Sequence, residues 1–203
     1  MRTVFDCIIP AAGASSRMGV WKPGLLFRGG TLLSAAVGIV LGAGCRAIVV
    51  AGRAADAVPG ALGSLADRVE LVFNHAWEEG MTGSLQAGMA RVDSPSFFVL
   101  PADMPFVPCR AFRALNREAE ARKAEGLPDR PIFPTFRGEP GHPVLIPSAL
   151  IPKARDLPRA ARFKDFLDTL GPAFVEVVDP GIRTDLDTRT EYEGALVLVS
   201  RRA

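Results

Sequence analysis

The sequence predicts an α/β protein in which helices cover both faces of a parallel sheet. Apolar segments of strand length recur over the first hundred residues, and a longer segment of helical character follows each of them. This alternation is typical of βαβ units, whose strands are buried on both faces. A loop of small residues directly follows the first expected strand, at the sheet edge where open α/β folds bind ligands.

The first half of the chain contains four expected strands, each followed by an expected helix. The strands are short runs of Val, Ile, Leu and Phe bounded by loop residues. The second helix is expected to break near Pro59, because proline interrupts a helix interior. In chain order, strands are expected at 4–10, 47–51, 69–73 and 97–100, and helices at 32–41, 54–66, 82–91 and 111–125.

The pattern changes after residue 126, although the length of 203 residues suits a single domain throughout. The segment Gly138-Glu139-Pro140-Gly141 predicts a turn between two short strands. Phe163, Phe166, Leu167 and Leu170 recur at helical spacing and predict one buried helix face. Strands are expected at 131–134, 144–146 and 174–178, and helices at 159–170 and 188–199.

Composition excludes several classes of protein. The 24 basic and 22 acidic side chains leave a net charge of +2, so neither a nucleic acid nor an anionic membrane is an expected partner. Three scattered cysteines favour neither a disulfide framework nor a Cys-x-x-Cys metal site. Residues 29–45 carry no charge, but their five glycines indicate a helix followed by a strand, not a membrane span. Because an acid occurs as early as Asp6, we expect no signal peptide and a soluble cytoplasmic protein.

The strongest local signal is the loop at 10–22, Pro-Ala-Ala-Gly-Ala-Ser-Ser-Arg-Met-Gly-Val-Trp-Lys. Small residues let the backbone approach a ligand closely, and successive N–H groups can form an anion-binding nest. Arg17 offers a forked guanidinium and Lys22 a compact charge for phosphate oxygens. The loop is not a Walker A motif, because Lys22 does not directly follow the second glycine. We predict phosphate binding here, and the alternative is a surface turn with an incidental Arg and Lys.

Two acidic segments are candidates for holding a metal ion. Asp103 directly follows an expected buried strand, which suits Mg²⁺ because this ion takes one or two carboxylates together with phosphate oxygens. Asp185 and Asp187 point the same way if their segment is extended, and either could meet the ion from another side. The structural alternatives are a turn or helix N-cap at Asp103, and capping of the last helix by Asp187 or Thr188.

Polar residues also follow the strand expected at 69–73. Asn74 is placed to contact a ribose or a base, while Thr82 and Ser84 could instead only cap the next helix. His75 and His142 belong to no cluster with metal-ligand spacing, which argues against a zinc site. The sequence has no Gly-x-Ser-x-Gly, which argues against a serine hydrolase.

Taken together, these motifs closely resemble those of the MobA-like nucleotidyltransferases, and most nearly the molybdenum cofactor cytidylyltransferase (MocA) branch. They occur in the family's order and span nearly the whole chain. The matching residues are Ala11, Ala12, Gly13, Ser16, Arg17, Met18, Gly19 and Lys22; Asn74, Trp77, Gly80, Met81, Ser84 and Leu85; Asp103-Met104-Pro105; Gly141-His142-Pro143-Val144; and Asp185-Leu186-Asp187-Thr188.

The resemblance implies a three-layer αβα, Rossmann-like fold of the GT-A type and Mg²⁺-dependent transfer of a nucleoside monophosphate. Asp103 matches the family's metal aspartate, and we assign Asp185 as a second metal carboxylate. Arg17 and Lys22 match its phosphate contacts and complete the expected catalytic set, while His142 would lie on the acceptor side. The expected nucleotide-binding residues are Ala11, Ala12, Gly13, Ser16, Arg17, Gly19, Lys22, Asn74 and Ser84.

The reaction implied by the resemblance moves CMP from CTP to a phosphorylated acceptor, molybdopterin or molybdenum cofactor, and releases pyrophosphate. Ala12 stands where the guanylyltransferase branch usually has glycine, which favours CTP over GTP. Residues 1–100 would form the nucleotide half and residues 101–203 the metal and acceptor half. The alternatives are a sugar- or polyol-phosphate nucleotidyltransferase, guanylyl transfer from GTP, and an idle nucleotide-binding maturation factor. A molybdoenzyme maturation partner is also left open.

Two positions depart from the family pattern. Gly24 is an extra glycine in Lys22-Pro23-Gly24-Leu25-Leu26, and it could shift Lys22 relative to the phosphates. At the helix start, Thr82-Gly83-Ser84 replaces a more usual Gly-Ser-Ser, and this could alter the floor of the acceptor site.

Overall fold

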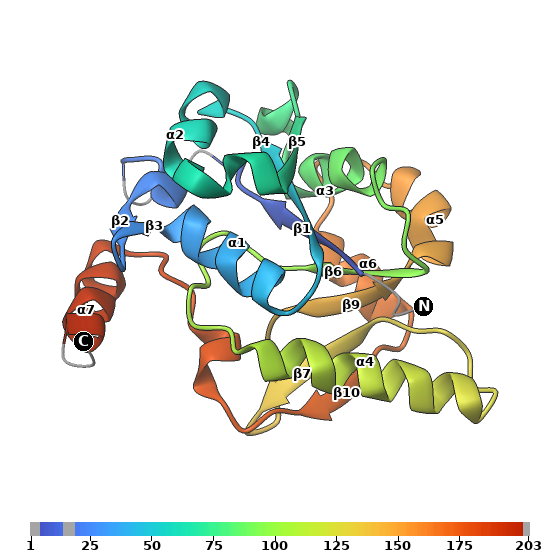
Figure 1. The fold of residues 1–203 in the computed structure, drawn as a ribbon. Helices are drawn as coiled ribbons and strands as arrows, with labels where there is room; N and C mark the ends of the chain where they lie inside the picture. Colours follow the sequence, from blue (N-terminus) through green and yellow to red (C-terminus); the bar gives the residue numbers. More distant parts are fainter. Residues whose placement is uncertain (1–4, 14–18, 201–203) are drawn as a thin grey trace.

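One eight-stranded sheet forms the centre of the computed structural model, which describes residues 5–13 and 19–200 (Figure 1). Its strand order is β10-β7-β9-β6-β1-β4-β5, and β8 pairs with β7. Along this order every pairing is parallel except the two that β9 makes with β6 and β7. The strands are β1 Asp6–Pro10, β4 Arg46–Ala51, β5 Val69–Phe73, β6 Ser96–Val99, β7 Ile132–Phe136, β8 Glu139–Pro140, β9 Val144–Pro147 and β10 Ala173–Glu176.

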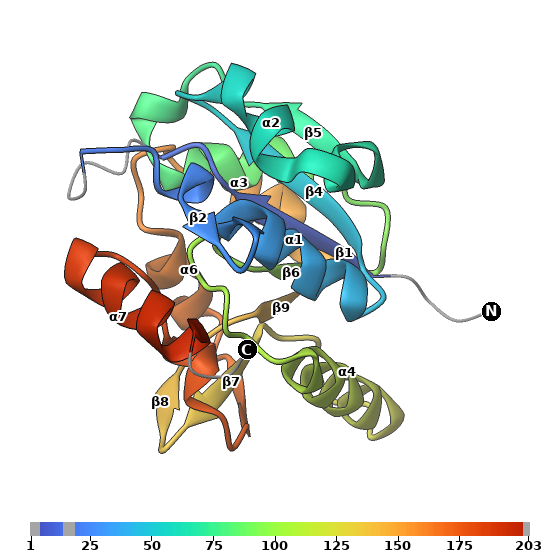
Figure 2. The same cartoon turned by 60° about the vertical axis from the view of Figure 1, so that its left-hand side comes forward.

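Helices cover both faces of this sheet, so the three-layer prediction is confirmed (Figures 1 and 2). Buried side chains of α1, α2 and α4 join one hydrophobic cluster, and those of α3, α5 and α6 join another across the sheet. Helix α7 lies to one side, where it packs on a small hairpin of β2 Leu26–Phe27 and β3 Gly30–Thr31. The helices are α1 Leu32–Gly42, α2 Val58–Leu62, α3 Met81–Met89, α4 Cys109–Ala124, α5 Ile151–Arg155, α6 Phe163–Thr169 and α7 Arg189–Ser200.

The uncharged stretch at 29–45 forms the hairpin end, helix α1 and the turn into β4. A capping box starts α1: Ser34 N–H donates to Thr31 Oγ1 over 3.0 Å, and Thr31 N–H donates to Ser34 Oγ over 2.7 Å. Residues Leu33, Ala36, Val37 and Val40 of this helix are fully buried against the sheet. Within the described residues, no helix is long and apolar enough to cross a membrane.

Two predicted helices differ from the structure, and two further elements were not predicted. The segment at 54–66 forms only short 3-10 turns around the five-residue α2, which begins at Val58, has Pro59 in its first turn and ends before Gly63. The helix expected at 159–170 is limited to α6, and α5 precedes it without having been predicted. The β2–β3 hairpin was also missed, because two-residue strands are too short to show an alternating pattern.

A buried ionic network closes the edge of the sheet opposite the carboxyl ends of β1 and β4. Asp6 is only 2% exposed, and its carboxylate accepts hydrogen bonds from Arg46 Nε at 2.6 Å and from Ser94 N and Oγ, each at 2.9 Å. Burial by itself raises the pKa of Asp6, but these donors outweigh it and the net pKa is lowered. The ionised form therefore stabilises the fold above the ordinary carboxyl pKa, and this stabilisation is lost as the pH falls through the lowered value.

We expect Asp6→Ala to lower the free energy of unfolding by about 3 kcal/mol, because it leaves buried donors of Ser94 and the Arg46 guanidinium without their acceptor. Urea unfolding at pH 7 measures this loss. The control is Asp168→Ala, which removes the exposed Lys164–Asp168 pair and should change the unfolding free energy by less than about 0.5 kcal/mol. Equal losses in the two variants would contradict a stabilising role for the Asp6 network.

Candidate active site

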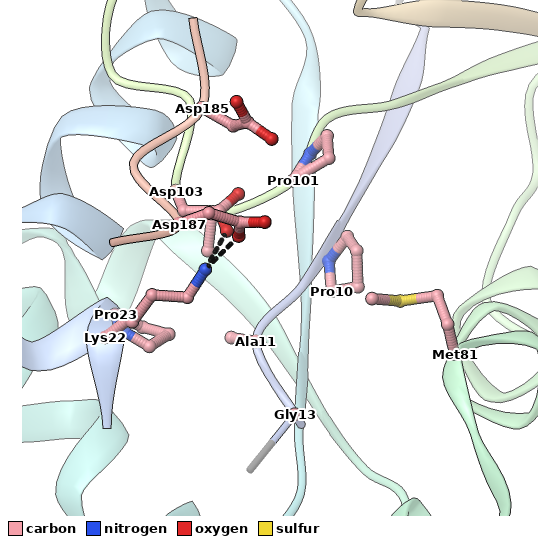
Figure 3. Close-up of a pocket in the computed structure, with 11 residues that line it drawn as sticks. Pro10, Ala11, Gly13, Lys22, Pro23, Met81, Pro101, Asp103, Asp185 and Asp187 are labelled. Atoms are coloured by element: carbon pink, nitrogen blue, oxygen red, sulfur yellow. Dashed lines mark hydrogen bonds and ion pairs between the residues drawn. The ribbon is translucent and has the colours of Figure 1, made fainter. Parts of the chain in front are cut away.

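A cavity of about 390 Å³ opens at the carboxyl ends of β1 and β6 (Figure 3). Parallel pairing of β1 with β4 and β6 brings the loops after these strands to one sheet edge, which is where ligands bind in open α/β folds. Residues from four distant segments line the cavity: Pro10, Ala11 and Gly13; Lys22 and Pro23; Met81; Pro101, Ala102 and Asp103; and Asp185 and Asp187.

Lys22 bridges two carboxylates in this cavity. Its Nζ lies 2.6 Å from Asp103 Oδ2 and 2.7 Å from Asp187 Oδ1, and Figure 3 shows both side chains directed at it. The Lys22 side chain is 13% exposed, so the ammonium is largely removed from bulk water. Burial alone would lower the pKa of Lys22, but the two carboxylates outweigh it and raise this pKa. Lys22 is therefore charged at neutral pH.

The backbone around Leu186 brings the third acidic residue to the same cavity. Leu186 is 1% exposed, and its N–H donates to the carbonyl of Asp103 over 3.1 Å. Because Asp185 and Asp187 flank this buried residue, both line the cavity, as their spacing predicts. Asp187 does not cap α7: that place is taken by Thr188, whose Oγ1 accepts from Glu191 N–H over 3.2 Å.

The donor set of the cavity suits a magnesium ion bound together with a phosphate ligand. Among the described residues, no group of three His, Cys, Asp or Glu side chains is arranged to hold a metal by itself. Mg²⁺ does not need such a cage, since it usually takes one or two carboxylates and completes its shell with phosphate oxygens and water. Burial, followed by repulsion from Asp187 and Asp103, raises the pKa of Asp185, as expected where carboxylates crowd. Asp103, with Asp185 or Asp187, is thus able to hold the ion.

The entry to the predicted phosphate loop is fixed by backbone contacts. Ala11 N–H donates to the carbonyl of Val50 over 2.8 Å, and Trp21 Nε1 donates to the carbonyl of Ala11 over 3.2 Å. The extra Gly24 accommodates the Trp21 ring, because a Cβ at residue 24 would lie 2.7 Å from it. In a chain that has this glycine, Lys22 still contacts the carboxylates of Asp103 and Asp187.

Two of the predicted phosphate-loop residues, Ser16 and Arg17, lie outside the described residues. Ala12 is buried and does not line the cavity, and Gly19 has a φ of 68°.

Asn74 and Ser84 are not brought into the Lys22 cavity. Asn74 Nδ2 donates to Ser84 Oγ over 3.0 Å, and Asn74 Oδ1 accepts from the N–H of Ala76 over 3.1 Å. Both side chains are buried, at 6% and 2% exposure. They join the end of β5 to α3, and their contact with a nucleotide stays a prediction. Neither Thr82 nor Ser84 caps α3, since Thr82 Oγ1 instead donates to the carbonyl of Ala161 over 2.6 Å.

Two further cavities adjoin the Lys22 cavity. An apolar cavity of about 480 Å³ shares Pro10, Met81 and Pro101 with it. A third cavity of about 350 Å³ shares Pro101, Asp103 and Asp185 with it. His142 lines the apolar and the third cavity but not the Lys22 cavity, a position compatible with its predicted place on the acceptor side.

The sequence prediction underestimated two residues of the site. Asp187 was only an alternative to Asp185, yet it is Asp187 that contacts Lys22. Gly52 was not singled out, although a Cβ there would lie 2.7 Å from Ala12 Cβ and 2.8 Å from its carbonyl oxygen. The glycine is needed so that the loop after β4 can approach the loop after β1. Its place directly after a buried strand was the one available signal.

Comparisons with known proteins identify the family and the fold. A family model described as MobA-like NTP transferase domain matches residues 7–173. Over 190 residues, covering 94% of each chain, the sequence is 27% identical to the molybdenum cofactor cytidylyltransferase of Escherichia coli (strain K12).

Solved structures show the same fold. Rv0371c from Mycobacterium tuberculosis H37Rv superposes with a TM-score of 0.83 at 23% identity, covering 97% of this chain and 99% of that chain. Its complex with manganese superposes with a TM-score of 0.76 at 21% identity, covering 96% and 99%. A nucleotidyl transferase from Methanothermobacter gives a TM-score of 0.82 at 22% identity and full coverage of both chains.

We expect Gly52→Ala to lower the free energy of unfolding by roughly 1–3 kcal/mol, because the added methyl group overlaps Ala12 and Trp77 and the loops cannot both keep their places. Gly60→Ala in α2 is the matched control, since no atom lies within 4 Å of the added Cβ. Gly60→Ala should leave the free energy of unfolding unchanged or raise it by up to about 1 kcal/mol, because alanine has a higher helix propensity than glycine. Thermal or urea unfolding compares the two variants. An unchanged free energy of unfolding in Gly52→Ala would disprove the close approach of the loop after β4 to the loop after β1.

A second prediction concerns His142. Desolvation, opposed by the charge of Asp103, lowers the pKa of His142 from 6.5 to about 4. Between these values the unfolded chain binds a proton that the folded chain does not, so stability should fall as the pH drops from 6.5 toward 4. From pH 7 to pH 5, the wild type should lose roughly 2 kcal/mol more unfolding free energy than His142→Gln. Urea titrations at both pH values test this, and equal losses would show that His142 titrates normally in the fold.

Proposed function

Because the chain belongs to the MobA-like NTP transferase family, we propose that it transfers CMP from CTP to a phosphorylated acceptor and releases pyrophosphate. The acceptor in this proposal is molybdopterin or the molybdenum cofactor, the class named for the E. coli relative. One observation chiefly supports a transferase over a simple binding protein: Lys22 is held between Asp103 and Asp187 at the sheet edge, next to the predicted phosphate loop.

In the proposed reaction, an oxygen of the acceptor phosphate attacks the α-phosphorus of CTP. A new P–O bond forms as the bond from the α-phosphorus to the bridging oxygen of pyrophosphate breaks, and pyrophosphate takes the electron pair. The acceptor phosphate is already ionised at neutral pH, so no general base is required. Catalysis then depends on positioning and on neutralising charge. This agrees with a cavity whose described lining has a cation and carboxylates but no nucleophile–base pair.

The chain's own residues have separate tasks in this proposal. Lys22 and Arg17 contact the phosphates, and Ala11, Ala12, Gly13, Ser16 and Gly19 form the loop around them. The carboxylates of Asp103 and Asp185 or Asp187 would hold Mg²⁺, which neutralises charge on the phosphates when bound. The Lys22 cavity takes the nucleotide, so that residues 1–100 supply most of its contacts. Residues 101–203 supply the metal carboxylates and the acceptor contacts.

The apolar cavity favours a ring system over a sugar as the body of the acceptor. Its walls include Leu85, Phe133, Val144, Ile146 and Phe163. A sugar or polyol placed against these apolar walls would lose water from several hydroxyl groups, with few polar side chains in the lining (His142, Arg162 and Lys164) to replace it, which is unfavourable. A planar, partly apolar ring system would bury its faces against the same walls. This cavity is the reason to place the sugar-phosphate alternative second.

The proposal is tested by measuring pyrophosphate release from each of the four NTPs with Mg²⁺, using the molybdenum cofactor or sugar phosphates as acceptor. We expect release with CTP and the molybdenum cofactor. Release with GTP, or with sugar phosphates, would transfer the assignment to the corresponding alternative. Binding of CTP without release under any condition would instead identify an idle nucleotide-binding maturation factor.

We expect Asp103→Asn to reduce turnover by at least about a hundredfold, because the amide keeps the shape of the side chain but removes the charge that pairs with Lys22 and a metal. Glu193→Gln on α7 is the control and should keep full activity, since that exposed carboxylate pairs with exposed Arg189 and lines none of the three cavities. Thermal unfolding of both variants checks that the fold is intact. Magnesium-dependent turnover retained by Asp103→Asn would refute the role given to Asp103.

A further inference from the structure

The third cavity connects the two ligand cavities of the proposed site. It shares Asp103 and Asp185 with the Lys22 cavity, and it shares Pro140, Gly141 and His142 with the apolar cavity. A ligand whose body lies in the apolar cavity can therefore extend a group past His142 to the carboxylates. The third cavity is the place where such a group would meet the reacting phosphorus.

The charges lining this route are unequal. In the part of the chain that the structure describes, Lys22 and Arg183 are the two cationic residues that line a cavity together with Asp103. Lys22 lines the first cavity and is already bonded to two carboxylates, whereas Arg183 lines the third. His142 adds no charge there at neutral pH, because desolvation lowers its pKa to about 4. Arg183 is thus the cation that an anionic group entering the third cavity would meet.

Arg183 is held only loosely by its neighbour. Its guanidinium lies 3.8 Å from Glu139 Oε2, and the two side chains are 45% and 64% exposed. An exposed pair at this distance contributes little, so a ligand with a better-placed anion can displace Glu139. A guanidinium can give two parallel hydrogen bonds to a phosphate, which a monodentate contact with Glu139 does not match.

The backbone beneath Arg183 is fixed by close packing. The 3-10 helix Pro180–Arg183 begins with a cap in which Asp179 Oδ1 accepts from Gly181 N–H over 2.8 Å. His142 N–H donates to the carbonyl of Ile182 over 2.8 Å, and a Cβ on Gly141 would lie 2.2 Å from that same oxygen. His142 and Arg183 therefore keep their relative places at the rim of the third cavity, without a hinge between them.

We propose that Arg183 binds the phosphate of the acceptor in the third cavity and presents it to the α-phosphorus of the nucleotide. This inference rests on the proposed function and adds a residue to it. Arg183 holds one or two non-bridging oxygens of the acceptor phosphate, and a remaining oxygen makes the attack. As a positioning residue, it should affect the acceptor far more than the nucleotide, whose phosphates lie in the Lys22 cavity.

The test compares Arg183→Gln, Arg183→Lys and Glu139→Gln in steady-state pyrophosphate release, varying the molybdenum cofactor and CTP separately. For Arg183→Gln we expect the acceptor KM to rise about tenfold or more, while the CTP KM changes less than about twofold. Arg183→Lys should give an intermediate acceptor KM, because it keeps the charge but loses the fork. Glu139→Gln should leave the acceptor KM unchanged or lower it, because it removes a competing anion.

The two partners of the ion pair thus act in opposite directions if Arg183 binds the acceptor. Parallel effects of Arg183→Gln and Glu139→Gln, or an unchanged acceptor KM in Arg183→Gln, would overturn the inference. If the wild type releases no pyrophosphate, the proposed function itself has failed, and calorimetry with inorganic phosphate takes over as the test. Phosphate binding that is lost in Arg183→Gln but kept in Glu139→Gln then supports the anion site, and binding that is the same in all proteins refutes it.

Discussion

The ion bridge that Lys22 makes with Asp103 and Asp187 is the interaction on which the arrangement of the site depends. It joins the loop after β1, the loop after β6 and the segment before α7, which are far apart in the chain. A partly buried ammonium at 2.6–2.7 Å from two carboxylates is stable only while both remain in place, because a buried charge without its partner is costly. The fold must therefore present all three side chains together.

The sheet and its edges meet this requirement through backbone contacts. Parallel pairing places the ends of β1 and β6 side by side, and Leu186 N–H bonds to the carbonyl of Asp103. The buried Leu186 side chain then fixes the orientation of the acidic residues on either side of it. At the far end of the same strands, the Asp6 network anchors β1 to β4 and to the segment before β6. Polar side-chain contacts and loop hydrogen bonds thus secure both ends of a sheet whose middle is held by strand pairing and apolar packing.

Much of this could be predicted from sequence, because the strands at 47–51, 69–73 and 97–100 stand out as apolar runs. The first and third are buried, and the strand at 69–73, at the edge of the sheet, is only partly buried. The cavity edge followed from the same pattern, since Asp103 directly follows an expected strand and Lys22 ends the loop that follows another. What the sequence could not show was pairing at long range. Nothing local distinguishes Asp187 from Asp185, and only the folded chain shows which of them contacts Lys22. Likewise, Asn74 is a polar residue directly after an expected strand, a common position for a ligand contact, yet its amide donates to Ser84.

Charge balance connects the bridge to the rest of the site. Among the described residues that line the Lys22 cavity, Asp103, Asp185 and Asp187 carry three negative charges against the single positive charge of Lys22, which leaves two in excess. The pKa of Asp185 is raised chiefly by burial, and repulsion from Asp187 and Asp103 adds to the rise. A triphosphate is itself strongly anionic, so such a cavity attracts it only if further positive charge accompanies it. A divalent cation held by the carboxylates, Arg17 in the phosphate loop and Arg183 in the third cavity are the proposed sources. On this view, the bridge keeps the carboxylates in place while the nucleotide is absent, and binding of the cation and of the nucleotide are coupled.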